Sequence, residues 1–252
     1  MDLFLIIAII LLAFSCEFLD TSLGGGYGTI LTPVLLLFKL DVFYIVPSIL
    51  MSEILTGFGG AISHQYFGNT DFSSNDKINR RIFYLIGGLG VIASALSVII
   101  ALQLNKVIIK VYIGILVLIL GLLMFRAKNY IFSWKKLGAI GLLSAFNKSI
   151  SGGGFGPLVT AGQVVSGRSV KNSIGVALAC ETPVCIVGLV SYILFNGIFS
   201  LDLAIALIIG AVPATFIGAL TTKRVGNEKT LKKLVGILAI FLGTFTIMKT
   251  FI

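Results

Sequence analysis

The 252-residue chain has little charge: 12% of its residues are Asp, Glu, Lys or Arg, against about 25% in soluble domains. It also has one histidine and only three cysteines, without CxxC spacing, so neither a zinc site nor a disulfide framework is expected. No cofactor and no bound metal are predicted. The chain shows no HExxH run, no Ser/His/Asp set and no catalytic pair of carboxylates, so it is not expected to be an enzyme.

Hydrophobic residues are abundant instead, at 57% of the chain, and the mean hydropathy is +1.08. Apolar segments such as 82–103 and 107–125 have the length that a helix needs to cross a hydrocarbon layer of about 30 Å. The first segment has no Lys or Arg before it, so we expect it to be retained rather than cleaved as a signal peptide. The net charge of +9 comes from residues between apolar segments, which is typical of cytoplasmic loops and not of a nucleic-acid partner.

The apolar segments form two groups of five, which predicts an N-terminal repeat over 1–126 and a C-terminal repeat over 127–252, together one transmembrane domain. The first group is 3–23, 28–38, 42–67, 82–103 and 107–126, and the second is 134–150, 156–166, 170–196, 203–222 and 233–252. A shift of 128 positions aligns the two halves without gaps, with identities that include Phe18/Phe146, Gly24/Gly152, Gly25/Gly153, Gly26/Gly154, Gly28/Gly156, Thr32/Thr160, Val42/Val170, Glu53/Glu181, Gly60/Gly188, Ser63/Ser191 and Phe67/Phe195. Matched glycines and acids at one spacing indicate an internal duplication.

Segments 28–38 and 156–166 are too short to cross alone, since eleven helical residues extend only about 16 Å. Each one either continues the preceding helix or folds back with it as a re-entrant hairpin. Hairpins place 14 basic residues on one side and 4 on the other, whereas straight crossings give no bias, so the tendency of Lys and Arg to stay in the cytoplasm favours hairpins. The larger set is Lys77, Arg80, Arg81, Arg126, Lys128, Lys135, Lys136, Arg168, Lys171, Lys223, Arg224, Lys229, Lys232 and Lys233, and the smaller is Lys39, Lys106, Lys110 and Lys249.

These patterns predict an all-α integral membrane protein built as an inverted repeat. Each half is expected to be a re-entrant, glycine-tipped helix hairpin plus three transmembrane helices, about eight spans by hydropathy. Both termini are predicted to lie outside the cell.

The two glycine runs, GGGYG at 24–28 and GGGFG at 152–156, are the predicted substrate site. Irregular backbone at membrane depth is tolerated only inside protein or beside a wet cavity. Glycine amides at the start of a short helix form a cradle for an anion, although triple glycine also serves tight helix packing. The expected substrate-binding residues are Gly24, Gly25, Gly26, Gly28, Gly152, Gly153, Gly154, Gly156, Asn147 and Lys148.

Ionisable residues inside spans are costly and are therefore functional candidates. The duplicated Glu53 and Glu181 are candidates for proton coupling, or else structural carboxylates bonded to a broken helix end. His64, eleven residues after Glu53, is a candidate for a proton relay or an interfacial residue. Lys148 takes the position equivalent to Asp20, so the two either pair with each other or leave Lys148 to attract the anion.

The segments GGGYGTILTP and SGGGFGPLVTAGQVVSGRSVKNSIGVALACETP resemble the two signature segments of the TauE/SafE sulfite exporter family. The resemblance covers nearly the whole chain. It implies a bacterial or archaeal cytoplasmic-membrane permease for small sulfur-containing anions, such as sulfite, a sulfonate or sulfoacetate, coupled to an ion gradient. One departure is that Pro33 aligns with Ala161 and Pro157 with Thr29, so the two short helices need not have the same shape.

The expected function is thus transport of a small anion by alternating access, with protons as the expected coupling ion and the lipid bilayer as the surrounding partner. A passive anion channel and a non-transporting membrane accessory or sensor protein remain alternatives. Transport of a metal cation is a weaker one, because glycine amides are donors, which repel cations. The sequence leaves the oligomeric state open.

Overall fold

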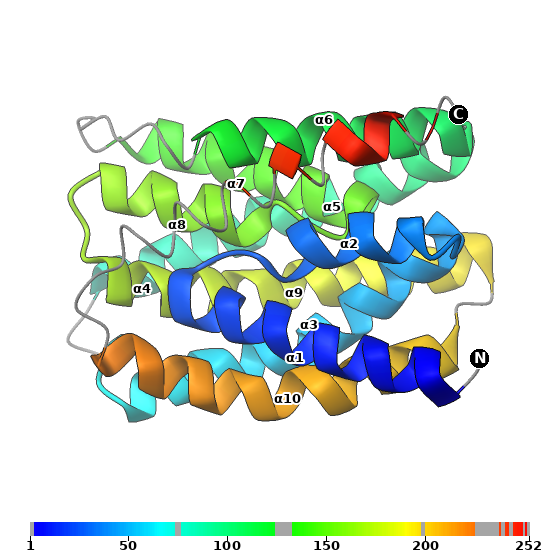
Figure 1. The fold of residues 1–252 in the computed structure, drawn as a ribbon. Helices are drawn as coiled ribbons and strands as arrows, with labels where there is room; N and C mark the ends of the chain where they lie inside the picture. The colour runs from blue at the N-terminus through cyan, green and yellow to red at the C-terminus, as the bar shows by residue number, and fades with distance from the viewer. Residues whose placement is uncertain are drawn as a thin grey trace.

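The computed structural model describes residues 3–73, 77–123, 133–197 and 200–224, with scattered positions between 237 and 250. The part of the chain so described is all-helical, with ten α-helices running side by side along one direction (Figure 1). The elements are α1 (Leu3–Leu23), α2 (Tyr27–Leu37), α3 (Val42–Tyr66), α4 (Lys77–Ile82), the π-helical turn η1 (Phe83–Gly87), α5 (Gly88–Gln103), α6 (Lys106–Leu123), α7 (Trp134–Ser151), α8 (Phe155–Val165), α9 (Val170–Asn196) and α10 (Leu201–Arg224).

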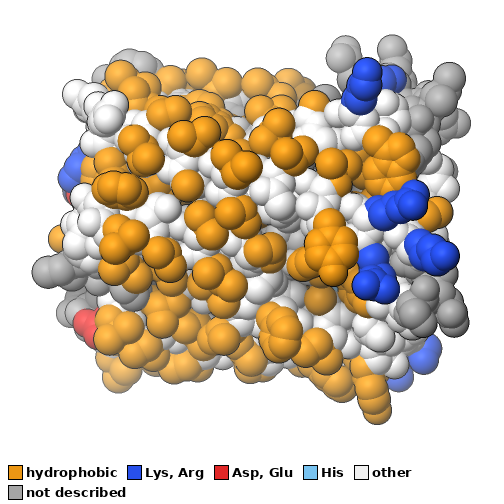
Figure 2. Space-filling view, turned by 180° about the vertical axis from the view of Figure 1, so that it is seen from behind, with side chains coloured by type: hydrophobic (Ala, Val, Ile, Leu, Met, Phe, Trp, Pro, Cys, Tyr) orange, Lys and Arg blue, Asp and Glu red, His pale blue; other side chains and the backbone are white. Residues whose placement is uncertain are grey.

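Five of these helical stretches are long and apolar enough to cross a membrane: α1, α3, the continuous run Lys77–Gln103, α9 and α10. The multi-pass membrane character expected from composition is thereby confirmed. The predicted total of about eight spans stays a prediction, since its last segment, 233–252, lies largely outside the described residues. Figure 2 shows hydrophobic side chains covering the flank of the bundle and Lys and Arg gathered toward one end.

One end of the bundle is where three loops meet. Asp41 accepts a hydrogen bond from the Phe43 amide at the start of α3 and forms an ion pair with Lys106 at the start of α6. A pocket of about 410 Å³ is lined by Asp41 and Lys106 together with Asn196 and Gly197 at the end of α9. The α2–α3, α5–α6 and α9–α10 connections therefore share this end, which we call the Asp41 end.

The opposite end joins the connections after α3, before α9 and after α10. Arg168 donates a hydrogen bond to the side chain of Asn79, and Lys171 donates one from Nζ to the Lys223 carbonyl at 2.8 Å. Exposed basic residues of α4 (Arg80 and Arg81) belong to the same end. We call it the Arg168 end.

Glycine contacts fix the direction of α1 relative to α10. A methyl group on Gly210 would fall 2.2 Å from the Ile10 carbonyl oxygen, and one on Gly218 would fall 2.8 Å from the Thr21 side chain. Both sequence numbers rise together, so α1 runs parallel to α10 and begins at the Asp41 end. Close approach of this kind needs glycine, because any side chain would push the helices apart.

Helices α5 and α7 are likewise parallel. Gly141 packs on Ile86, Ala145 lies 3.2 Å from the position of a methyl on Gly90, and Ser97 bonds to the Phe146 carbonyl at 2.8 Å. Since α5 leads away from the Arg168 end, α7 begins at that end.

Helices α3 and α9 cross in opposite directions at the centre of the bundle. Leu50 lies 3.1 Å from the position of a methyl on Gly188, and Leu178 lies 2.9 Å from that on Gly60. A shift of 128 positions takes Leu50 to Leu178 and Gly60 to Gly188. The two contacts are therefore equivalent, with the roles of the two helices exchanged. The crossing brings Glu53 and Glu181 to the middle of the bundle.

Candidate functional site

Each glycine run is a short break between two helices. Gly24 follows α1 with φ of 80°, and Gly152 follows α7 with φ of 76°. These angles are left-handed, a conformation that glycine adopts without the steric penalty of a Cβ atom. The chain resumes as α2 at Tyr27 and as α8 at Phe155. We call 24–28 the first tip and 152–156 the second tip.

The two tips touch backbone to backbone. A methyl group on Gly28 would fall 1.6 Å from the Gly152 carbonyl oxygen, and one on Gly156 would fall 3.3 Å from the Gly24 carbonyl oxygen. These contacts are again related by the shift of 128. The close approach of the other tip therefore favours glycine at both positions.

Most tip amides have acceptors within the protein. At the first tip, Gly24 N donates to the Asp20 carbonyl at 2.7 Å, and Tyr27 N donates to the Asp20 carboxylate at 3.1 Å. At the second, Gly152 N donates to the Lys148 carbonyl at 2.7 Å, and Gly154 N donates to Thr29 Oγ1 at 3.1 Å. Asp20 thus caps α2, whereas the equivalent position before α8 carries the cation Lys148.

A buried ion cluster lies beside the tips. Lys148 is 1% exposed, and its Nζ forms ion pairs with Glu53 and, at 2.7 Å, with Glu181, which are each 3% exposed. Glu17 is also buried and accepts a hydrogen bond from Thr21 at 2.6 Å. Buried charges are stable only when paired in this way. The pairing joins Glu53 of α3 and Glu181 of α9 to Lys148 near the end of α7.

The expected pair between Asp20 and Lys148 is corrected by this arrangement. In the described residues the ion pairs of Lys148 are with the two glutamates, while Asp20 caps α2. Sequence reasoning missed this cap, although a carboxylate just before a glycine break and a short helix is a recognisable signal for one. Asn147, a predicted substrate ligand, accepts a hydrogen bond from the Tyr112 hydroxyl.

His64 and Tyr192, which are 128 positions apart, make equivalent hydrogen bonds. Its Nε2–H donates to the Thr21 carbonyl at 2.9 Å, and the Tyr192 hydroxyl donates to the Ser149 carbonyl at 3.0 Å. The two bonds are equivalent under the shift of 128 and tie α3 and α9 to the helices that lead into the tips. This geometry favours a structural role for His64. A relay between Glu53 and His64 stays a prediction.

One ligand atom from each of Glu53, Glu181 and Cys185 lies within 4.8 Å of the others. Such a group has donor types that bind divalent metals. Here the Lys148 ammonium is paired with both carboxylates and supplies the positive charge at this place.

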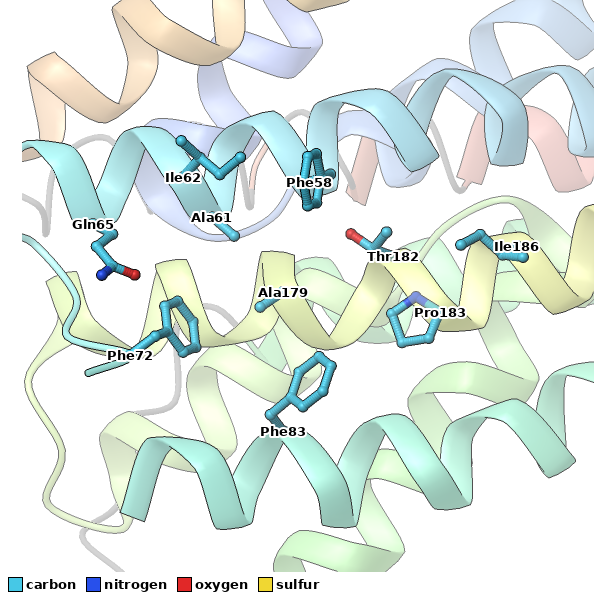
Figure 3. A pocket seen from close by; sticks show the side chains of 10 residues that line it. All are labelled: Phe58, Ala61, Ile62, Gln65, Phe72, Phe83, Ala179, Thr182, Pro183 and Ile186. Atoms are coloured by element: carbon cyan, nitrogen blue, oxygen red, sulfur yellow. The ribbon is translucent and has the colours of Figure 1, made fainter. Parts of the chain in front are cut away.

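An apolar pocket of about 470 Å³ lies elsewhere, between α3, η1 and α9 (Figure 3). Its ten described lining residues carry no charge and include Phe58, Phe83 and Pro183. Phe58 and Ile62 are 63% and 54% exposed on the flank of the bundle. The described pocket lining has no charged side chain that could pair with a buried anion. The tips and the ion cluster therefore remain the candidate site.

Comparison with known proteins gives two matches. A family model described as "Sulfite exporter TauE/SafE" matches residues 9–246. The probable membrane transporter protein YtnM of Bacillus subtilis (strain 168) is 28% identical over 155 residues, which cover 57% of this chain and 49% of YtnM. The chain thus spans about half the length of this curated relative. No solved structure matches it.

Proposed function

The chain belongs to the TauE/SafE sulfite exporter family, and on this premise we propose that it carries a small sulfur-containing anion across the cytoplasmic membrane by alternating access. Sulfite, a sulfonate or sulfoacetate are the proposed substrates. The family is one of membrane transporters and not of enzymes. The observation that carries the proposal is the meeting of the two glycine tips beside a buried lysine.

The proposed architecture is an inverted repeat of residues 1–126 and 127–252. Several reciprocal contacts support it, in which residue i of one half meets residue j of the other and the residues shifted by 128 meet as well. Leu50 with Gly188 and Leu178 with Gly60 are one example, and Gly28 with Gly152 and Gly156 with Gly24 are another. Such exchange is the property of a twofold axis, as in a symmetric dimer interface.

Each tip belongs to a proposed re-entrant hairpin. Helix α1 begins at the Asp41 end, and α2 leads back to Asp41 at that end. Helix α7 begins at the Arg168 end, and α8 leads back to Arg168 (Figure 1). This arrangement supports hairpins that enter from opposite sides and meet in the middle.

Charge at the site supports proton coupling. The carboxylates of Glu17, Asp20, Glu53 and Glu181 are all buried, whereas Lys148 is the only buried lysine or arginine among the residues that the structure describes. An anion that enters such a place is repelled unless protons neutralise some of the acids. A proton on Glu53 or Glu181 would also release one ion pair of Lys148, whose charge then becomes available to the anion. We therefore propose that anion and proton move together or in strict alternation.

Transport in proteoliposomes tests the function. Uptake of labelled sulfite, thiosulfate and taurine is measured with an imposed pH gradient, with a protonophore and without any gradient. A coupled carrier saturates with anion and loses accumulation when the protonophore is added. Flux that follows only the anion's own gradient identifies a passive channel, and no flux of any of these anions identifies an accessory or sensor protein.

Labelling from each face tests the topology. Cysteines placed at Lys39 and Arg168 should react with an impermeant maleimide from opposite faces, Lys39 from outside and Arg168 from the cytoplasm. Both termini are proposed to lie outside. Labelling of the two sites from one face would refute the inverted arrangement without deciding whether the protein transports anions.

A further inference from the structure

We propose that the hydroxyl groups of Thr32 and Thr160 are the hydrogen-bond donors that hold the oxygens of the transported anion. The inference rests on the proposed function and assigns two ligands that do not come from the glycine amides or from Lys148. The two threonines are register equivalents, one on each short helix.

Both hydroxyls lie at the tips. Thr160 Oγ1 is 2.7 Å from the position of a methyl on Gly24, and Thr32 Oγ1 is 2.8 Å from that on Gly152. Each short helix therefore directs its threonine at the first glycine of the opposite tip. The two contacts are related by the shift of 128 positions, so each half contributes one hydroxyl to the place where the tips meet.

Neither hydroxyl has a hydrogen-bond partner among the described residues, although Thr32 is 1% and Thr160 3% exposed. Two other buried threonines, Thr215 and Thr222, bond to a carbonyl one turn earlier, at 3.1 Å to Ala211 and 3.0 Å to Gly218. A buried hydroxyl without a partner destabilises a fold, and native structures contain few of them. That the same exception occurs at both equivalent positions points to a ligand.

The chemistry of that ligand follows from the donors. A hydroxyl can donate its single proton to a negatively charged oxygen, and such charge-assisted bonds are the stronger ones. Two donors from opposite tips fit an anion with at least two terminal oxygens, such as sulfite or a sulfonate.

The test uses variants that remove the hydroxyl but keep the shape. Thr32→Val and Thr160→Val should each raise the KM for sulfite uptake by about tenfold to a hundredfold, the range for losing a hydrogen bond to a charged group. Thr32→Ser and Thr160→Ser keep the donor and should stay close to wild type. Thr215→Val is the matched control, since it removes a buried hydroxyl that bonds within its own helix.

Thermal stability separates a ligand role from a structural one. Without anion, Thr160→Val should melt at or above the wild-type temperature, because the lost hydroxyl had no partner. The rise in melting temperature that sulfite gives the wild-type protein should be lost. Alanine at either position removes the donor in a second way if valine does not fold.

The inference is overturned if the wild-type protein transports sulfite and the valine variants do so with unchanged KM. It is also overturned if they keep the KM for sulfite but need more sodium, since the threonines would then bind a coupling cation. If the wild-type protein moves neither sulfite, thiosulfate nor taurine, the proposed function fails first and this inference falls with it.

Discussion

Replacing Lys148 by methionine should destabilise the protein strongly. Methionine keeps most of the volume of the side chain and removes its charge. The carboxylates of Glu53 and Glu181, each 3% exposed, would then lose the cation that both contact. The substitution therefore tests the loss of the charge and not a loss of packing.

The magnitude follows from known buried ion pairs. Removing one partner of such a pair costs about 3–5 kcal/mol, because an uncompensated charge is left in the interior. For chains of about this size, each kcal/mol shifts the melting temperature by about 2–4 °C. Lys148→Met should accordingly lower the melting temperature by roughly 6–20 °C.

The assay is thermal unfolding of the detergent-purified protein, followed by the loss of the monodisperse peak in size-exclusion chromatography. Lys135→Met is the matched control, since Lys135 is exposed near the start of the same helix and should tolerate the change. Neutralising the acids should restore stability. The triple variant Lys148→Met, Glu53→Gln, Glu181→Gln should regain most of the lost temperature.

Two results would refute this reasoning. A Lys148→Met protein that melts within about 2 °C of wild type would show that the lysine does not balance buried acids, since even one uncompensated charge should lower it more. A triple variant that melts as low as the single one would show that the loss comes from packing of the lysine stem.

Three further predictions follow from contacts and burial. Gly28→Ala should abolish transport, because its Cβ would fall 1.6 Å from the Gly152 carbonyl oxygen, whereas Gly59→Ala, with only one atom at 3.9 Å, should transport normally in the same flux assay. Partial burial acts to raise the pKa of Asp41, but hydrogen bonds from Lys106 and a backbone amide outweigh it and lower the pKa below its ordinary value of 3.8. The stabilisation from this carboxylate is therefore present above about pH 4 and is lost as the pH falls through the lowered pKa. Asp41→Asn should be less stable than wild type at pH 7, by no more than about 1 kcal/mol, and the difference should shrink as the pH is lowered below about 4. The three cysteines are all buried and should resist maleimide until the protein is denatured, as mass spectrometry would report.

The helices were largely predictable because they depend on local properties. An apolar run of sufficient length folds as helix wherever a membrane removes water from the backbone. The predicted segments 42–67 and 170–196 agree within a residue with α3 and α9. The positions of both tips were predictable for the same reason, since consecutive glycines interrupt a helix whatever lies around them.

The pairing of charges was not predictable in this way. Register suggested that Asp20 and Lys148 would pair, because they occupy equivalent positions. In the structure, however, Lys148 contacts Glu53 of α3 and Glu181 of α9. Only the crossing of α3 and α9 decides this, and the crossing depends on glycines that are far apart in sequence.

The amino-acid sequence alone was enough to identify a helical membrane protein with two glycine breaks and a few ionisable residues in its spans, and to predict an internal duplication. Hydrophobic length, glycine content and a constant spacing of 128 are properties of the chain alone. The tertiary structure decided which groups share the centre: Asp20 on the α2 terminus, Lys148 between two glutamates, and Thr32 and Thr160 each against the opposite tip. The physical reason is that a spacing relates residues only in sequence, whereas contacts between helices depend on how closely their backbones approach.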